Sequence, residues 1–362
     1  MIDFLEGIIP YISGLYTLPW ILVGFILTIL IAKITGREKI DKIMKKIGLI
    51  LLYFFVPVLL FRIFLGTDFG EEQIKFSAIV AAIIFFMYLL AFIFAKYNIK
   101  KHKLTGEKKN LYLKTVLTNQ GRSSAFIGGA MLAIEAWAVP AGIYMALVGI
   151  ALFAVIPYIL ARMHKKESKN SEKVAQSNPL PWFLKLYPWY LIAFVIAGIA
   201  LHATVTNNIT GGGITLGDFG DLGFLIKFYT ALTIPAALYY VGAGIHPTDL
   251  KVSELKKLIG LDKSGGKESH WIWVRSIFIL TVAITPILTA IIFGPLYAIG
   301  AIPASWFAVI TINSILPITS TNVFLLPYGI DRKSTVHSVT WTTLVCVPII
   351  VALIAIFGTS LT

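Results

Sequence analysis

The chain of 362 residues contains a single cysteine, Cys346, and only 14% charged residues. One cysteine excludes an intrachain disulfide, and its place inside an apolar block is typical of a small buried side chain. Soluble proteins are roughly 45–50% apolar and about 25% charged, whereas this chain is 57% hydrophobic with a mean hydropathy of +0.82. The apolar residues form blocks near the ~20 residues that cross a bilayer. The composition therefore predicts an all-α, polytopic membrane protein.

Acidic residues are also scarce within the apolar blocks. Glu135, Asp221 and Asp249 all fall near block ends, and a proton-coupled carrier usually places a titratable group in its core. Metalloprotease and serine-hydrolase motifs and paired intramembrane carboxylates are missing as well. We therefore expect no enzyme, no catalytic residue, no metal site and no cofactor. Backbone carbonyls could still hold Na⁺, so the coupling ion stays open.

Ten apolar segments are predicted to span the membrane. The loops between them alternate, because odd-numbered loops are rich in lysine and arginine and even-numbered loops are not. By the positive-inside rule the odd-numbered loops face the cytoplasm and both termini lie outside the cell membrane. The same loops account for the formal net charge of +13, so we expect no nucleic-acid partner. The predicted spans are residues 18–35, 47–65, 76–95, 111–134, 140–161, 181–202, 222–245, 272–293, 304–326 and 336–357.

The basic loop at 162–180 divides the chain into two sets of five spans, residues 18–161 and 181–357. Because five is odd, the two halves have opposite orientations in the membrane, as in inverted-repeat transporters. A Pro-x-x-Leu-aromatic pattern begins at Pro57 and again at Pro235, in the second span of each half. We therefore expect one membrane domain, residues 1–362, built from two inverted five-helix repeats.

Polar residues interrupt the fourth span of each half. The sequence Asn-Gln-Gly-Arg-Ser-Ser occupies residues 119–124, and Pro317 with several hydroxyl residues stands in the matching place of the second half. Gly121 permits backbone geometry that a helix does not use, and Pro317 lacks an N–H and clashes with the preceding turn. Interruptions at matching positions are the best sequence pointer to a transporter's binding site. Helices 4 and 9 are therefore predicted to break near the bilayer midplane.

The chemistry of these interruptions favours an anion. Each break would present a new helix N-terminus, with partial positive charge and unpaired N–H groups. Arg122 adds a full charge, although an arginine at a helix centre costs roughly 2.5–3.5 kcal/mol on insertion scales. The segment is interpreted as a pocket for a carboxylate or a similar small anion. The predicted substrate-binding residues are Asn119, Gln120, Arg122, Ser123, Thr319, Ser320 and Asn322, with Gly121 and Pro317 at the helix breaks.

Other interpretations stay open at this point. Arg122 could pair with backbone carbonyls and hold the break open without touching a solute. Asn119 and Asn322 could form interhelical hydrogen bonds alone. Arg62, near the outer end of its span, could snorkel outward, and Lys114 is interpreted as an anchor near a cytoplasmic end.

At these residues the chain resembles the auxin efflux carrier family, within the bile acid/arsenite/riboflavin transporter superfamily. The resemblance implies ten spans in two inverted repeats, with helices 4 and 9 crossing at unwound residues beside the substrate. It also implies a scaffold part (spans one, two, six and seven) and a transport part that move relative to each other, often in a dimer. The implied substrates are organic anions such as indole acetate or dicarboxylates. The matching motifs, which cover most of the chain, are Phe54 to Phe61, Asn119-Gln-Gly121 with Gly128-Gly129, Pro235 to Gly244, and Pro317 through Tyr328-Gly-Ile-Asp331 to Pro348.

Two features depart from the family pattern. No proline stands at the break of span four, where Gly121 and Arg122 are found instead, and the family's ninth-helix asparagine falls at Ser320, two residues before Asn322. If Arg122 contacts solute, a more strongly anionic substrate is expected.

The sequence thus predicts a secondary transporter of small organic anions that is surrounded by membrane lipids. It would use alternating access with an elevator-like movement. The alternatives are a sodium-coupled organic anion symporter of the bile acid type and a channel or sensor that does not transport.

Overall fold

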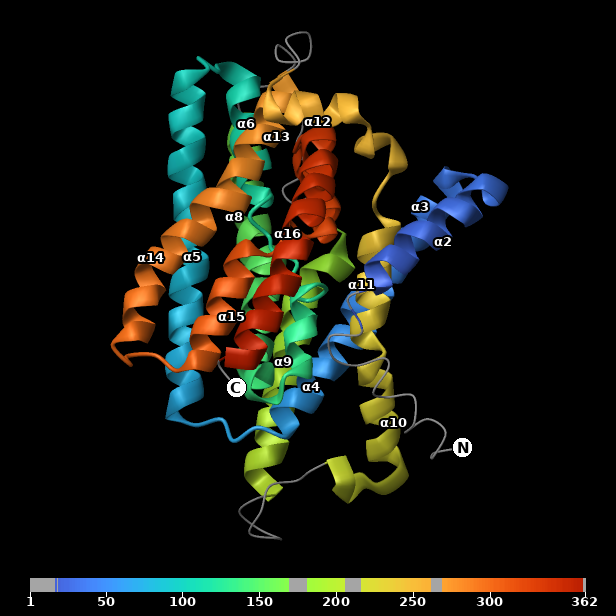
Figure 1. The fold of residues 1–362 in the computed structure, drawn as a ribbon, viewed down its shortest axis with the longest axis vertical. Helices are drawn as coiled ribbons and strands as arrows, with labels where there is room; N and C mark the ends of the chain where they lie inside the picture. Colours follow the sequence, from blue (N-terminus) through green and yellow to red (C-terminus); the bar gives the residue numbers. More distant parts are fainter. Residues whose placement is uncertain (1–16, 18, 169–180, 206–215, 262–268, 361–362) are drawn as a thin grey trace.

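The structure is a computed structural model that describes residues 17, 19–168, 181–205, 216–261 and 269–360 (Figure 1). Every regular element among these residues is helical, and the only β-type pairing in them is one isolated bridge. Most of the basic loop predicted at 162–180 lies outside the described residues. The all-α prediction is confirmed.

Helices of the first half of the chain are joined by short links. The elements are α2 (Trp20–Thr35), α3 (Arg37–Ile50), α4 (Val56–Leu65), α5 (Glu71–Lys101), α6 (Gly106–Thr118), the 3₁₀ helix η3 (Gly128–Ala133), α7 (Glu135–Ile150) and α8 (Ile156–Ser168).

The second half of the chain also consists of helices, and its described residues contain more short 3₁₀ helices. Its elements are α9 (Trp182–Val205), η6 (Leu216–Phe219), α10 (Gly220–Ala231), α11 (Thr233–Ala243), η7 (Pro247–Leu250), α12 (Val252–Ile259), α13 (Ser269–Ile279), α14 (Thr285–Ala298), α15 (Ala304–Ile315), the 3₁₀ helix η10 (Ser320–Tyr328) and α16 (Arg332–Ser360).

Three π-helical turns keep pairs of these helices continuous. They join α3 to α4, α7 to α8 and α13 to α14, and in each case a proline follows two residues after the turn: Pro57, Pro157 and Pro286. Proline has no N–H and clashes with the carbonyl four residues earlier. The wider π turn takes that carbonyl out of the ordinary ladder, so the helix passes the proline without ending.

Seven helices in the described residues are long and apolar enough to cross a membrane, and α2 and α15 are shorter apolar helices. This is compatible with a multi-pass membrane protein. The segment predicted as span four is different, because α6 ends at Thr118 and no long helix follows before Glu135. The count of ten spans stays a prediction. The seven long helices cover Arg37–Leu65, Glu71–Lys101, Glu135–His164, Trp182–His202, Gly220–Ala243, His270–Ala298 and Arg332–Gly358.

The helices pack in two groups, visible on the right and left of Figure 1. In the first helix group α2 lies along α11, and α4 lies along α9 and α10. In the second helix group α5 contacts α6 and α7, α13 contacts α16, and α15 contacts α7 and α14. Helix α7 also contacts α4 and α9, so it forms the boundary between the groups.

Glycines allow the backbones of the first helix group to approach closely. A Cβ added to Gly24 of α2 would lie 2.2 Å from the Tyr239 carbonyl oxygen of α11, and one added to Gly242 would lie 1.9 Å from that of Ile21. Small residues at such crossings are typical of helix packing in membranes, where contact between backbones replaces the hydrophobic driving force.

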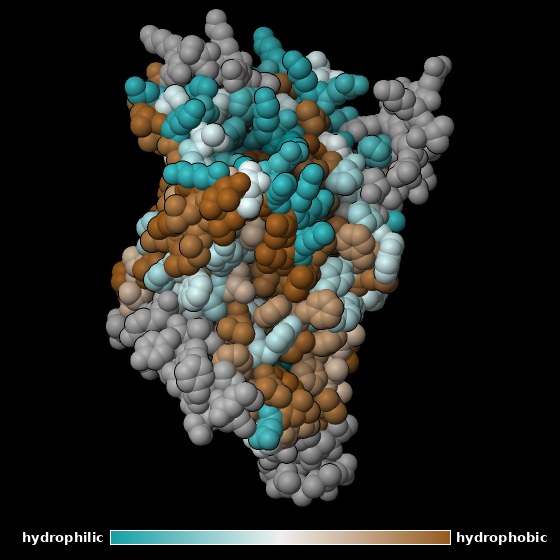
Figure 2. All heavy atoms as spheres, turned by 90° about the vertical axis from the view of Figure 1, so that its right-hand side faces the viewer, coloured by the Kyte–Doolittle hydropathy of each residue, from teal (hydrophilic) through white to brown (hydrophobic). Residues whose placement is uncertain are grey.

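The surface is divided by polarity. Large apolar side chains face outward along the helices, such as Phe85 of α5 at 69% exposed and Ile291 of α14 at 63%. Figure 2 shows hydrophilic atoms gathered at one end, above a region where hydrophobic atoms predominate. At this end lie the α5–α6 link, α12 and the start of α16 (top of Figure 1). An apolar belt below a basic end fits a lipid-facing surface.

Candidate functional site

The two polar interruptions predicted from the sequence meet in the structure. The segment between α6 and η3 pairs with the segment between α15 and η10. The Ser123 N–H donates to the Pro317 carbonyl at 2.9 Å, and the Thr319 N–H donates to the Gly121 carbonyl at 2.9 Å. These two bonds flank an isolated antiparallel bridge between Arg122 and Ile318. Residues about 200 positions apart in sequence therefore form one short, buried pairing.

Gly121 is needed here for space. Gly121 lies outside the helices, and its φ is not among the positive values found in the described chain, so a left-handed backbone is not the reason for a glycine here. A Cβ at this position would stand 2.6 Å from Asn322 Oδ1 and 2.8 Å from a methyl carbon of Leu152. The absence of a side chain at Gly121 thus lets the two paired segments and the continuous α7–α8 helix pack closely at this position.

Proline and hydroxyl residues shape the second segment. Pro317 lacks an N–H, and its carbonyl is turned toward Ser123. Thr319 precedes η10, where its Oγ1 accepts a long hydrogen bond of 3.4 Å from the Thr321 N–H. Ser123 Oγ similarly accepts from the Ile127 N–H at 3.4 Å. Hydroxyl residues at these places satisfy free N–H groups where helical turns begin.

Two of the polar side chains bind to neighbouring helices. Asn119 Nδ2 donates to the Thr115 carbonyl at 2.8 Å and to Thr335 Oγ1 of α16 at 3.2 Å. Ser124 Oγ donates to Asn313 Oδ1 of α15 at 2.9 Å. For Asn119 the structure therefore supports the interhelical role left open by the sequence, although its Oδ1 has no partner among the described residues.

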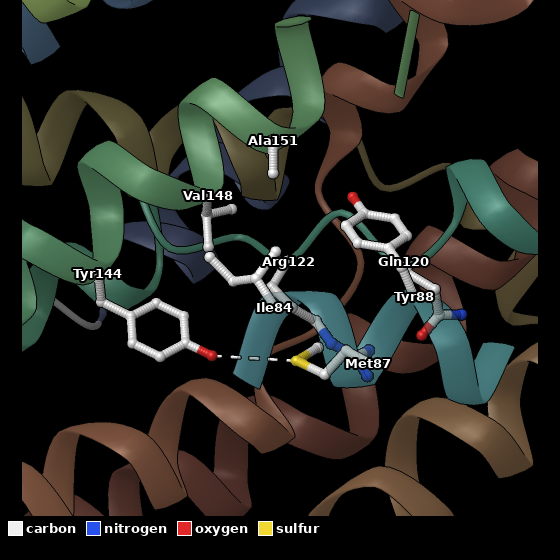
Figure 3. A pocket seen from close by; sticks show the side chains of 8 residues that line it. All are labelled: Ile84, Met87, Tyr88, Gln120, Arg122, Tyr144, Val148 and Ala151. Carbon is white, nitrogen blue, oxygen red and sulfur yellow. Dashed lines mark hydrogen bonds between the residues drawn. The ribbon is translucent and has the colours of Figure 1, made fainter. Parts of the chain in front are cut away.

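Arg122 is the chemical centre of the site. Its side chain is buried, at 2% exposed, and none of its three guanidinium nitrogens has a hydrogen-bond partner within the described residues. Figure 3 shows the guanidinium beside Met87, with Tyr144 on one side and Tyr88 and Gln120 on the other. An isolated charge in such a place is costly unless a counter-charge or hydrogen bonds offset it. The hydrogen-bonding capacity of this guanidinium is therefore unused by the described part of the chain.

Several other polar atoms of the paired segments are buried without a partner in the described part of the chain. They comprise two hydroxyl oxygens, three amide oxygens that can only accept and one amide nitrogen that donates, and buried polar atoms of this kind are expected to pair with bound water or a polar ligand. These atoms are Thr118 Oγ1, Asn119 Oδ1, Gln120 Oε1, Ser320 Oγ, and both Nδ2 and Oδ1 of Asn322.

Two small cavities meet at Arg122. The first lies between α5 and α7 and is lined by Ile84, Met87, Tyr88, Gln120, Arg122, Tyr144, Val148 and Ala151. Its volume is about 10 Å³.

The second cavity lies at the boundary between the two helix groups and has a volume of about 20 Å³. Space of this size holds about one water molecule. In this conformation neither cavity has room for a ligand much larger than water. The lining residues are Leu52, Val56, Arg122, Ala125, Phe126, Met145, Val148, Gly149, Leu152, Phe153, Tyr187, Thr319 and Thr321.

The structure divides the predicted site residues into two sets. Gln120, Arg122 and Thr319 line the cavities. Asn119, Ser123, Ser320 and Asn322 do not line either cavity and instead belong to the paired segments around them. Gly121 and Pro317 lie within the pairing itself.

The sequence prediction missed the aromatic residues around Arg122. Tyr88 of α5, Tyr144 of α7 and Tyr187 of α9 all line these cavities. A tyrosine in the middle of an apolar helix must place its hydroxyl near a partner, and this signal was present in spans three, five and six. Tyr144 Oη lies 3.9 Å from Met87 Sδ.

Two basic residues near the predicted site have other partners. Lys114 is buried at 4% exposed, and its Nζ donates to the Tyr328 carbonyl at 3.0 Å; the interpretation as a surface anchor is therefore wrong. Arg62 of α4 donates to Thr230 Oγ1 of α10 at 2.7 Å and ties these two helices together. Neither lies among the cavity-lining residues.

No group of three or more His, Cys, Asp or Glu side chains suited to a metal occurs among the described residues. Comparison with protein-family models and with curated proteins finds no match to this chain. The chemistry around Arg122 is accordingly the main guide to function.

Proposed function

We propose that the protein is a secondary carrier of small organic anions in the cell membrane. Its binding site lies where residues 119–124 meet residues 317–322. The observation that supports this most is the buried guanidinium of Arg122, which has no hydrogen-bond partner in the described part of the chain. Among the described residues, neither cavity at this point is lined by an aspartate or a glutamate, so the positive charge is free to pair with a solute.

A carboxylate suits this site. The planar fork of an arginine binds two carboxylate oxygens at once, and charge-assisted bonds of this kind are among the strongest in proteins. The Gln120 side chain lies beside the same cavity. Met87, Val148 and other apolar residues line the cavities, and such low-polarity surroundings strengthen the electrostatic attraction.

The proposed architecture has ten spans in two inverted repeats, with helices 4 and 9 broken and crossing at the site. The reciprocal hydrogen bonds of Gly121 with Thr319 and of Ser123 with Pro317 support it, because an inverted repeat places matching segments face to face. The resemblance of the sequence to auxin efflux carriers supports the same arrangement.

Transport would proceed by alternating access with an elevator-like movement. The first helix group, α2, α3, α4, α9, α10 and α11, would be the scaffold, and the second would carry Arg122 across. The second cavity lies between the groups and has a mostly apolar lining, which allows sliding without breaking polar bonds. The closed cavities favour a carrier over an open channel. We also propose that the protein forms a homodimer, that its odd-numbered loops face the cytoplasm and that both termini lie outside the cell.

The first test is the thermal stability of the purified protein with a panel of small carboxylates, with and without sodium. A ligand that binds only the folded state, and is present at a concentration of 100 times its Kd, stabilises the protein by about 2.7 kcal/mol. We expect at least one carboxylate to raise Tm in the wild type and in Arg62→Gln, the matched control, but not in Arg122→Gln.

A hit that requires sodium would favour the symporter alternative. Absence of any hit, or equal hits in both arginine variants, would contradict an anion site at Arg122. For any hit, flux into proteoliposomes should saturate and show counterflow; flux without saturation would indicate a channel, and binding without flux would indicate a sensor.

A further inference from the structure

Helix α12 (Val252–Ile259) lies crosswise at the basic end of the molecule, whereas the long helices run along the long axis of the molecule (Figure 1). It stands in the chain between α11, which ends at Ala243, and α13, which begins at Ser269. Both neighbours belong to predicted membrane spans. A helix in this place lies at the level where a bilayer would meet water.

The side of α12 that faces away from the protein carries apolar side chains. Val252, Leu255 and Ile259 recur at positions i, i+3 and i+7, which places them on one side. They are 68%, 39% and 56% exposed, and Leu261 just beyond the helix is 72% exposed. Only Leu258 is buried, at 3%. The exposed side of α12 is therefore an apolar surface.

Polar side chains occupy the opposite, inward side. Lys257 Nζ and Glu254 Oε1 form a salt bridge of 3.2 Å, and their side chains are only 23% and 19% exposed. A short helix in water would expose such a pair and bury its leucines and isoleucines. The reversed pattern is expected when the outer medium is itself partly apolar.

The orientation of α12 is held by α13. Arg275 Nε donates to the Leu258 carbonyl at 2.8 Å, and its Nη2 donates to the Lys257 carbonyl at 2.8 Å. Gly260 ends the helix with a φ of 82°, and a Cβ there would lie 3.0 Å from the same guanidinium. The arginine clamp satisfies the free carbonyls at the helix end, so the apolar surface cannot simply rotate inward.

The charge around this surface is positive. Lys251 and Lys256 are exposed beside the apolar side chains. The nearby acids are turned away, since Glu254 pairs with Lys257 and Asp249 lies 3.6 Å from His337 with its side chain 14% exposed. An outward face of apolar side chains flanked by lysines complements anionic headgroups above acyl chains.

We propose that α12 is an interfacial helix that binds anionic phospholipid on the cytoplasmic leaflet. The apolar surface, Val252, Leu255, Ile259 and Leu261, enters the boundary between headgroups and acyl chains, and Lys251 and Lys256 contact the negative headgroups. This rests on the proposed membrane location and topology, and is independent of what Arg122 binds.

Site-directed spin labelling tests the proposal. The label is placed on single cysteines in a Cys346→Ala background, in vesicles of phosphatidylcholine with and without one quarter phosphatidylglycerol. Ile259→Cys reports on the apolar surface, Phe85→Cys on the belt of α5 and Lys108→Cys on a water-exposed site. Relaxation by oxygen marks lipid, and relaxation by a water-soluble nickel chelate marks water. We expect the label at position 259 to be relaxed by oxygen, and more strongly when phosphatidylglycerol is present. In the double variant Lys251→Gln, Lys256→Gln, this increase with phosphatidylglycerol should be smaller.

Each of the other possible results would contradict a specific part of the proposal. Nickel contact at 259 with oxygen contact at 85 would disprove lipid binding by α12 and leave the membrane location intact. Nickel contact at 85 as well would disprove the membrane location itself. Contact with neither reagent at 259 would mean that protein, such as a second copy, covers the surface. Equal contact in both lipids would disprove the preference for negative charge.

If the Cys346→Ala background does not fold, hydrogen exchange on the wild type in nanodiscs replaces it. The amides of residues 252–259 should exchange more slowly when phosphatidylglycerol is present. Unchanged exchange there would overturn the proposal.

Discussion

At the scale of single residues, the molecule contains a charge that nothing in its described part neutralises. Arg122 is enclosed by tyrosine, methionine and aliphatic side chains of α5 and α7. The cost of keeping such a charge buried is several kcal/mol after relaxation. In the function proposed above, a bound anion would supply the missing counter-charge.

Arg122→Gln should separate a binding role from a structural one. We expect carboxylate affinity to fall about 10- to 100-fold, as for the loss of a charge-assisted hydrogen bond worth about 1.5–3 kcal/mol. Without ligand, Tm should stay equal or rise, because the variant removes a buried charge without a partner. Calorimetry of the purified variant measures both. A fall in ligand-free Tm larger than that of Arg62→Gln would show that the guanidinium stabilises the fold.

Gly121→Ala tests the close approach of the paired segments. The added methyl group would meet Asn322 Oδ1 at 2.6 Å and Leu152 at 2.8 Å, and overpacking of this kind costs about 1–3 kcal/mol. Gly294→Ala in α14 is the control, because nothing outside the neighbouring part of its own helix lies within 4 Å of its added Cβ. Its stability should change little, because the gain in helix propensity is offset by the position directly before Pro295. Thermal unfolding that shows equal effects would contradict the crowding.

At the scale of elements, two histidine–aspartate pairs hold the link between α11 and α12. His246 Nε2 lies 3.7 Å from Asp41 Oδ2 of α3, which belongs to the first helix group. His337 Nε2 of α16 lies 3.6 Å from Asp249 Oδ1. Burial alone would raise the pKa of Asp249, but the hydrogen bond and charge of His337 outweigh it, so the pKa lies below its ordinary value. The link thus contacts both helix groups through titratable side chains.

His246 should make stability depend on pH. Burial, assisted by the charge of Arg37, lowers its pKa below the ordinary 6.5, against the opposing charges of Asp41 and Asp249. The unfolded chain therefore binds more protons near pH 6, and this contribution to stability is present above pH 6.5 and lost as pH falls. Arg332 acts in the same direction as Arg37.

The measurement is Tm at pH 7.5 and pH 5.5 for the wild type and for His246→Gln. As pH falls, the wild type should lose more stability than the variant. Parallel changes in both proteins would show that His246 is not responsible.

At the scale of the whole molecule, the two helix groups meet along α7, with α4 and α9 on the other side. The contact is mostly apolar and contains the second cavity. Hydrophilic atoms gather at one end of the molecule on the face drawn in Figure 2. In the proposed mechanism, a relative movement of the two groups along this boundary would open the site.

Cysteine accessibility in intact cells tests the orientation of the whole. In the Cys346→Ala background, Glu71→Cys should react with a membrane-impermeant thiol reagent from outside, and Lys108→Cys only after the membrane is made permeable. The positive-inside rule requires this because Lys108 stands in a basic link and Glu71 in an acidic one. The reverse labelling would overturn the proposed topology.

Much of the fold could be predicted from local patterns. The lengths of the apolar blocks indicated where the long helices lie, since crossing a bilayer demands a minimum length, although one of them begins at Arg37 rather than at the predicted residue 47. The polar segments at 119–124 and around Pro317 were conspicuous because an apolar helix has no local use for such residues. What could not be predicted was the identity of their neighbours, because Tyr88, Tyr144 and Tyr187 lie on other helices and resemble any tyrosine in an apolar span.

The sequence by itself determined the helical class and the two unusual segments, because composition and hydrophobic block length act locally along the chain. Only the tertiary structure decided that these segments pair through Gly121 and Pro317, and that Arg122 lines small cavities where no described residue supplies a counter-charge. It also decided that the apolar side chains of α12 face outward and that Lys114 is buried. Such facts depend on which distant surfaces come into contact, and packing between helices is a property of the whole chain that no local pattern encodes.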